Sequence, residues 1–222
     1  PLLPSDHWSV RVWEFPRLQI AVLLLANLVA IGGFYHHNLL VTASLIGVNL
    51  GALVYQMYWI LPYTPLVKPT VKINNNPDPK RSVKIINANV LMTNHDVAKL
   101  ITLVEQEQPH ILVTLESNQW WQDALTPLHA VYPYRVNYPL DNLYGMHVFS
   151  RLPLSDIITA ERVEKGVPSV HCVAQLESGE RIKCHFVHPA PPSPTENEEA
   201  TERDIELLGL AKEIAQTDSA DG

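Results

Sequence analysis

Three polar side chains stand at the ends of apolar, strand-like segments, where α/β folds place their chemistry. Asn89 ends a run that begins at Val83, Glu116 ends the run 111–116, and His188 ends the run 181–188. Carboxylate and amide oxygens are hard ligands that suit Mg²⁺ or Mn²⁺, and a nearby histidine can stabilise a phosphate or move a proton. Each residue alone also fits a structural role: Asn89 as a turn or cap, Glu116 as a helix start, and His188 as a core or loop histidine.

Two His–Cys pairs form a second group of potential metal ligands. The segments that carry them predict a hairpin with a three-residue loop and Gly179 in the left-handed conformation, which sets even-numbered residues opposite one another. Cys172 and Cys184 then share one face, while His171 and His185 share the other, so the four side chains cannot converge on zinc. We therefore expect buried, reduced cysteines.

The elements that would position these residues follow from hydrophobic periodicity. A helical face over 97–104 predicts a helix capped by Asn94 or Thr93, and further helices are predicted at 120–128 and at about 195–216. The sequence contains no glycine-rich dinucleotide or P-loop motif and no G-x-S-x-G. The predicted strands, in chain order, are 83–90, 111–116, 145–150, 156–162, 169–176 and 181–188.

The N-terminal region reads as a membrane anchor. The 50 residues between Arg17 and Lys68 contain no Asp, Glu, Lys or Arg. They divide into apolar runs at about 18–35 and 39–61, and about 20 residues suffice to span the hydrocarbon core. A soluble helix pair would carry a polar stripe, and a signal peptide would leave the second run unexplained. We predict a two-helix anchor at 1–61, a Pro/Asn-rich linker at 62–81 and a second domain at 82–222.

Small residues recur every four positions in the second apolar run, at Ala43, Gly47 and Gly51. They share one helix face and allow another helix to approach closely. We expect this face to pack against the first run in preference to forming a dimer.

The charge distribution separates the two halves. The chain carries a formal net charge of −7, with five Lys/Arg against three Asp/Glu in residues 1–80 and eleven against twenty in residues 81–222. This balance excludes a polybasic nucleic-acid coat, and the 46% hydrophobic content excludes intrinsic disorder. Positive charge flanks both apolar runs, which favours, without fixing, a cytoplasmic location for that face.

Four segments in order resemble the endonuclease/exonuclease/phosphatase family, which includes DNase I-like nucleases, inositol polyphosphate phosphatases and neutral sphingomyelinases. They are 85–90, 108–116, 144–153 and the strand end at His188, and the resemblance covers about 82–216. The apolar runs and the His-Pro-Ala-Pro-Pro loop are most similar to a bacterial membrane-anchored branch. The resemblance implies an α/β four-layer sandwich of two mostly antiparallel sheets flanked by helices. The two transmembrane helices predicted from the apolar runs precede it, and we expect them in the bacterial inner membrane.

The resemblance also implies a reaction, hydrolysis of a phosphoester by metal-activated water. Glu116 would be the principal Mg²⁺ ligand (or Mn²⁺ ligand), Asn89 would help to bind the metal or phosphate, and catalytic His188 would contact the scissile phosphate. Nucleic acid, phospholipid and small organic phosphates are the candidate substrates. The acidic second half disfavours duplex binding, because Lys/Arg contacts supply most non-specific affinity.

The sequence departs from the family at its end. A later Gly-Asp-x-Asn motif and a final Ser-Asp-His motif are missing from the chain, which begins at Pro1 and stops at Gly222. We therefore expect a C-terminally truncated fragment that is inactive by itself. The alternatives are a non-catalytic membrane protein whose remnant domain is a binding module, and a membrane protein outside this family whose acidic domain binds a partner.

Overall fold

The computed structural model describes residues 5–34, 38–69, 71 and 73–220, with side chains to residue 216. The chain divides into two compact units, residues 1–74 with 192–200, and residues 75–191 with 201–222. The boundary after residue 74 falls inside the predicted linker. Short helical turns lie outside the main elements: α1 Trp8–Arg11, η1 Val12–Glu14, η2 Leu61–Tyr63 and η3 Pro79–Arg81.

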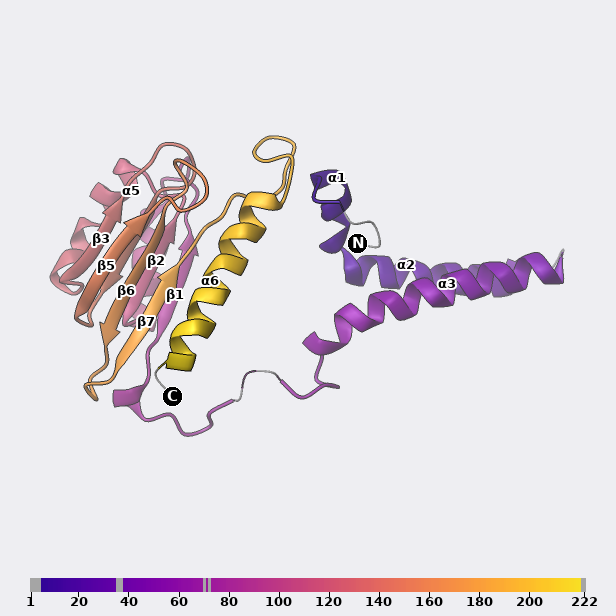
Figure 1. Ribbon diagram of the computed structural model, residues 1–222, viewed down its shortest axis with the longest axis horizontal. Coiled ribbons are helices and arrows are strands. Elements are labelled where there is room, and N and C mark those ends of the chain that lie inside the picture. Colours follow the sequence, from indigo (N-terminus) through magenta and orange to yellow (C-terminus); the bar gives the residue numbers. More distant parts are fainter. Residues whose placement is uncertain (1–4, 35–37, 70, 72, 221–222) are drawn as a thin grey trace. The chain divides into compact units, whose positions relative to one another are not determined.

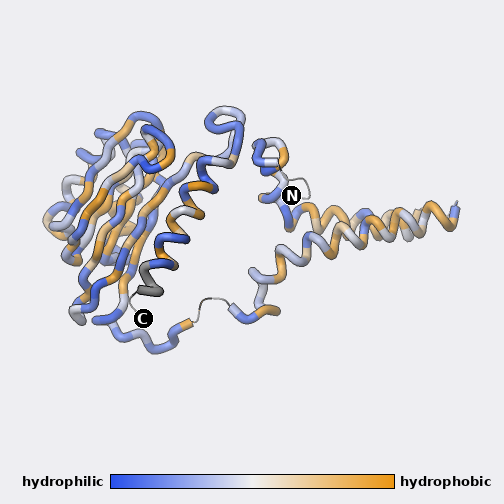
Figure 2. Tube along the Cα trace, in the orientation of Figure 1, coloured by the Kyte–Doolittle hydropathy of each residue, from blue (hydrophilic) through white to orange (hydrophobic). Residues whose placement is uncertain are grey.

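Two long apolar helices dominate the first unit (Figures 1 and 2). Helix α2 spans Arg17–Phe34 and α3 spans Leu39–Ile60. The side-chain oxygen of Asn38 accepts hydrogen bonds from the first N–H groups of α3 and so caps it. Both helices are long and apolar enough to cross a membrane. They follow the two predicted runs, except that Tyr35 lies outside the described residues.

Helix α3 packs against α2 through a different face from the one expected. Asn49 is 7% exposed and Ala21 of α2 is 4% exposed, which marks the contact between the two helices. Ala43, Gly47 and Gly51 are exposed, and a Cβ added at either glycine would meet no described atom within 4 Å. Asn49 lies on the opposite side of α3 from the small residues, because residues advance by 100° along a helix. The expectation that the small-residue face packs on the first helix is therefore wrong.

The strands in the described part of the second unit form two sheets (Figure 1). The first sheet has the order β1-β2-β4-β3, in which β1 and β2 are parallel and the other pairs antiparallel. The second sheet, β5-β6-β7, is antiparallel. The strands are β1 Ile85–Asn89, β2 Ile111–Leu115, β3 Tyr134–Tyr138, β4 Met146–Ser150, β5 Leu154–Ala160, β6 Ser169–Gln175 and β7 Arg181–Phe186.

The register of the β6–β7 hairpin agrees with the prediction. Cys172 pairs with Cys184 and His171 pairs with His185, and Gly179 has a φ of +89° in the connecting turn. Both cysteines are free and buried in the core between the sheets. Hydrogen bonding with Cys184 and burial raise the pKa of the Cys172 thiol, so it stays protonated. The histidines face away from this core, with their Nδ1 atoms 2.7 Å apart.

Two apolar cores hold the layers together. One lies between the sheets and contains Val113 of β2, Val148 of β4 and Val170 of β6. The other lies on the opposite face of the first sheet, where α4 (Val97–Glu107) and α5 (Gln119–Ala124) cover Leu112 and Phe149. A 3-10 helix, η4 Thr126–Ala130, continues from α5.

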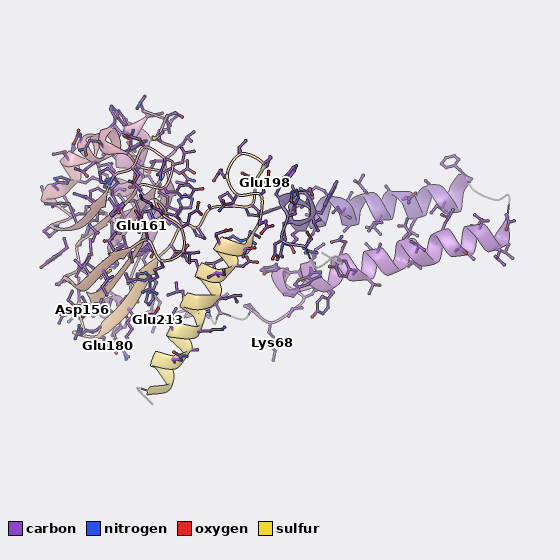
Figure 3. The ribbon with its side chains drawn as sticks, turned by 45° about the horizontal axis from the view of Figure 1, so that its top comes forward. Lys68, Asp156, Glu161, Glu180, Glu198 and Glu213 are labelled. Carbon is purple, nitrogen blue, oxygen red and sulfur yellow. The ribbon has the colours of Figure 1, made fainter. Side chains whose placement is uncertain are left out.

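Helix α6, Thr201–Ala220, lies on the outer side of the second sheet. Glu213 extends from it toward that sheet and meets Arg162 at 2.5 Å (Figure 3). Burial lowers the pKa of His171, whose ring faces away from the inter-sheet core, and the Glu213 carboxylate acts on this pKa in the opposite direction. On the same helix, Glu206 is only 8% exposed. The arrangement of α4 and α5, two sheets and α6 confirms an α/β fold with two sheets and flanking helices.

Some predicted boundaries are wrong for local reasons. Helix α6 begins at Thr201 and not near residue 195, because Ser193 N donates to Asn197 O at 2.8 Å and closes a loop there. The residue before α4 is Asp96, and Asn94 accepts from the Asp96 N–H at 3.0 Å instead of capping the helix. Strand β5 begins earlier than predicted and carries a bulge after Ser155.

Candidate functional site

The parallel pairing of β1 and β2 brings Asn89 and Glu116 together. Asn89 is the register partner of Leu115, so Glu116 follows directly beyond the end of the pair. Asn89 Nδ2 donates to Glu116 Oε1 at 2.5 Å, and Asn89 Oδ1 accepts from Leu91 N at 3.3 Å. The backbone of Glu116 is left-handed, with φ of +57°, and turns the chain out of the strand. Two of the three predicted residues therefore form one polar pair at the sheet edge.

A buried hydrogen-bond network lies beneath this turn. Ser117 is fully buried, and its Oγ lies 2.6 Å from His147 Nδ1 and 3.1 Å from Thr114 Oγ1. His147 Nε2 lies 3.3 Å from Gln122 Oε1, which can only accept, so Nε2 carries the proton and Nδ1 accepts from Ser117. Burial lowers the pKa of His147 to about 4, so its ring is neutral near pH 7. The network fixes the residue that follows Glu116.

Gly145 allows the start of β4 to approach the same turn. Ser117 N donates to Gly145 O at 3.0 Å. A Cβ at position 145 would lie 2.0 Å from Ser117 O and 2.7 Å from Leu140 N, both backbone atoms. No side chain fits there without moving the backbone, so this position requires glycine.

His188 follows β7 and reaches this region through Tyr144. Their ring centroids lie 5.6 Å apart with an interplanar angle of 54°. Tyr144 directly precedes Gly145, whose carbonyl accepts from the N–H of Ser117, the residue after Glu116. His188 is thus linked to the Glu116 turn through Tyr144, Gly145 and Ser117. His188 is half-buried. The contact brings the end of the second sheet to the end of the first.

A small cavity of about 210 Å³ opens beside Asn89. Asn94, Asp96, Lys99 and Trp121 contribute to its lining, between the end of β1 and the start of α4. Lys99 Nζ meets Asp96 Oδ2 at 2.6 Å, so the cavity wall carries a paired cation and anion. The cavity is large enough for a small polar group next to the Asn89–Glu116 pair.

The oxygen donors of the pair are of the type that Mg²⁺ prefers. Mg²⁺ is commonly bound through one or two carboxylates and keeps several waters. Glu116 supplies one carboxylate, and Asn89 supplies an amide beside it. Within the described part of the chain, no group of three or more His, Cys, Asp and Glu residues is placed to hold a metal. The carboxylate of Glu116 fits a cation that retains much of its water shell.

Sequence reasoning identified the pair and His188 but assigned no role to their supports. Ser117, Gly145 and His147 all lie in or next to the segments quoted for the family resemblance. The buried polar residues of β4 gave a usable signal, since a histidine inside an apolar strand needs a hydrogen-bond partner. His171 and His185 lie on the outer face of the second sheet, away from its inner core.

Comparison with solved structures gives the same fold at low sequence identity. A humanized TDP2 of D. rerio with 14 mutations is 13% identical, with a TM-score of 0.51 over 60% of this chain and 56% of that one. TDP2 of C. elegans is 10% identical, with a TM-score of 0.50 over 94% of this chain and 62% of that one. A selenomethionine form of TDP2 from Caenorhabditis elegans gives 10% identity and a TM-score of 0.50, over 100% of this chain and 64% of that one. The chain thus spans less than two thirds of the length of these proteins.

The sequence itself matches a family over most of its length. No protein of curated function matches it. Residues 86–220, more than half of the chain, match the Endonuclease/Exonuclease/phosphatase family, whose members are metal-dependent phosphoester hydrolases that generally use Mg²⁺. The matched region contains both sheets, the Asn89–Glu116 pair and His188. The chain belongs to the Endonuclease/Exonuclease/phosphatase family.

Proposed function

We propose that the chain is part of a membrane-anchored, Mg²⁺-dependent phosphoester hydrolase whose full length carries the activity. The observation that supports this most strongly is the Asn89–Glu116 hydrogen bond of 2.5 Å at the ends of two parallel strands, within a domain of this family. A carboxylate held in this way is preorganised to ligate a cation before substrate arrives. We propose multi-pass anchoring, in the bacterial inner membrane; α2 and α3 support the anchoring, because they are long and apolar enough to span a bilayer.

In this proposal each residue has a separate task. Glu116 ligates the cation through its carboxylate, and Asn89 orients that carboxylate by donating to Oε1. Ser117 and His147 hold the turn that carries Glu116, because their hydrogen bond is buried. His188 donates to a non-bridging oxygen of the scissile phosphate and so stabilises developing charge. When bound, Mg²⁺ would offset phosphate charge and lower the pKa of a water molecule.

The charge of the chain bears on the substrate. Residues 81–222 carry eleven Lys/Arg against twenty Asp/Glu. Such a surface repels the many phosphates of a long duplex, whereas a molecule with a single phosphodiester contacts only the residues of the site. Exposed acidic residues are distributed over this unit, including Asp156, Glu161 and Glu180 (Figure 3). We therefore propose lipid phosphodiesters or small organic phosphates as substrates in preference to duplex DNA.

Replacing the carboxylate of Glu116 tests the proposal directly. In the full-length protein, Glu116→Gln should lower Mg²⁺-dependent hydrolysis of bis(p-nitrophenyl) phosphate by about 100-fold or more, because a neutral amide binds the cation far less strongly. Glu105→Gln is the matched control, since Glu105 is an exposed glutamate on α4. Equal Mg²⁺-dependent activity in the two variants would contradict the assignment. Full-length protein with neither hydrolysis nor calorimetric Mg²⁺ uptake would favour the binding-module alternative.

A further inference from the structure

The first unit contains a large apolar cavity of about 820 Å³. Its walls come from the N-terminal turns α1 and η1, from the first half of α2 and from residues 48–56 of α3. Ile20 and Leu24 of α2 and Val48 of α3 form part of the apolar wall. The volume lies within the range of about 300–1,000 Å³ that is common for sites of small organic ligands.

Residues typical of a membrane interface surround one end of this cavity. Trp13 and Tyr55 line it, and their rings are of the kind that settles at headgroup level. Trp13 is 64% exposed and Phe15, which follows the same turn, is 74% exposed. A short segment with exposed aromatic residues beside charged ones fits a helix that lies in the interface. This end of the cavity therefore corresponds to the boundary between acyl chains and headgroups.

Three polar side chains line the cavity and limit what it can bind. Arg17 lines it with its guanidinium 5.0 Å from the centroid of the Trp59 ring. Glu14, the acidic residue of the lining, accepts from Arg11 at 3.3 Å, and Arg11 also donates to Asp6 at 2.8 Å. Gln56 also lines the cavity, and within the described residues its Oε1 is buried without a hydrogen-bond partner. Such an unsatisfied acceptor costs free energy that a hydroxyl or ammonium donor would recover.

We propose that this cavity binds one glycerophospholipid. An acyl chain lies against the apolar wall of α2 and α3, the phosphate meets Arg17, and a headgroup donor reaches the amide of Gln56. The inference rests on the membrane anchoring proposed above, and it adds a specific lipid site to that anchor. A phosphate-bearing lipid is favoured over a neutral one because Arg17 places a guanidinium in the lining, while Glu14, the acidic residue there, is bound to Arg11.

Two glycines of α3 provide a matched test of the cavity. Gly51 lines it, whereas Gly47 does not, and a Cβ at either position meets no described atom within 4 Å. Full-length protein is purified in mild detergent, supplied with phosphatidylglycerol or diacylglycerol, and examined by native mass spectrometry. The wild type and Gly47→Phe should retain one phosphatidylglycerol. Gly51→Phe, which fills the cavity, should retain at least tenfold less.

A variant of Arg17 distinguishes recognition of the headgroup from binding of the acyl chain. Arg17→Gln should abolish the preference for phosphatidylglycerol over diacylglycerol while the cavity still accepts an acyl chain. Equal retention of phosphatidylglycerol by Gly51→Phe and Gly47→Phe would overturn the site. A wild-type protein that is detected as a dimer without bound lipid would overturn it too. Carbonate extraction keeps the two proposals apart. A chain released at high pH refutes the anchor, whereas a chain that stays in the membrane but binds no phosphatidylglycerol refutes the cavity alone.

Discussion

In the proposed site, Asn89 orients the Glu116 carboxylate and Glu116 ligates the cation. Its amide is fixed between Glu116 Oε1 and Leu91 N, so the carboxylate has a defined orientation before a cation binds. Removal of a partner of this kind typically lowers metal affinity or activity by about 10–100-fold. Because Asn89 is exposed, its truncation should leave the fold intact.

The expected result for Asn89→Ala is Mg²⁺ affinity and hydrolysis lower by about 10–100-fold, with unchanged thermal stability. Asn87→Ala is the control, because Asn87 is exposed on the same strand, two residues earlier. Isothermal titration with Mg²⁺ and steady-state kinetics of the full-length protein measure the two effects. Indistinguishable behaviour of the two alanine variants would show that Asn89 does not orient the carboxylate.

His147 should make the second unit sensitive to acid. Burial lowers its pKa to about 4, whereas the pKa of a histidine in the unfolded chain is about 6.5. Between these values the unfolded chain binds a proton that the folded chain does not, so stability falls as pH falls. This residue alone should lower the free energy of unfolding by about 2 kcal/mol between pH 7 and pH 5. His171, whose pKa is lowered by burial, Arg162 and His185, should add in the same direction.

Urea unfolding at pH 7 and pH 5 measures the loss, and NMR titration of the His147 ring identifies its source. The ring should stay neutral down to about pH 5 in the folded protein. His147→Gln, which keeps hydrogen-bonding groups near Ser117, should show a smaller pH dependence. A His147 signal that titrates near pH 6.5 in the folded state would contradict this account.

At the level of elements, the start of β4 depends on the absence of a side chain at position 145. Gly145→Ala should shift the Ser117 backbone, since the new Cβ would lie 2.0 Å from a carbonyl oxygen. We expect destabilisation by more than about 2 kcal/mol and a loss of Mg²⁺ affinity, because overpacking against backbone forces the chain to move. Gly179→Ala is the comparison: its φ is +89° but its surroundings are open, so it should cost only about 1 kcal/mol. Equal costs measured by urea unfolding would contradict the steric explanation.

Local patterns predicted those elements whose residues alternate or repeat without competing interactions. The β6–β7 register followed from alternation around Gly179, and the meeting of Asn89 with Glu116 followed from two apolar strands joined by a helix. Strand β3, Tyr134–Tyr138, was missed although it is rich in strand-forming residues. It is only five residues long and lies between Pro133 and Pro139, which are typical of loops.

Other features depend on tertiary contacts that no local pattern contains. The face of α3 that meets α2 contains Asn49, which is buried. Asn49 is polar, whereas the sequence pattern favours the stripe of small residues as the contact between the helices. The buried bond between Ser117 and His147 joins residues 30 positions apart, and it exists because β2 and β4 are neighbours. The His188–Tyr144 contact likewise joins the two sheets.

At the scale of the whole molecule, the distribution of charge relates the anchor to the domain. Lys68, Lys80, Arg81 and Lys84 follow the second apolar helix, while Arg11 and Arg17 precede or begin the first. With two spans, both flanks lie on the same side of a bilayer, and basic flanks are retained in the cytoplasm. If α2 and α3 span a bilayer as proposed, the acidic domain would then lie on its cytoplasmic side.

Cysteine labelling can test this topology in the full-length protein. Leu39, at the start of α3, and Lys68, beyond its end, are both exposed, whereas the native Cys172 and Cys184 are buried and should react little. In right-side-out vesicles a membrane-impermeant maleimide should label Leu39→Cys but not Lys68→Cys, and permeabilisation should expose both. Unsubstituted protein sets the background. The reverse pattern would place the domain on the outer side, and equal labelling of both positions before permeabilisation would refute a two-span anchor.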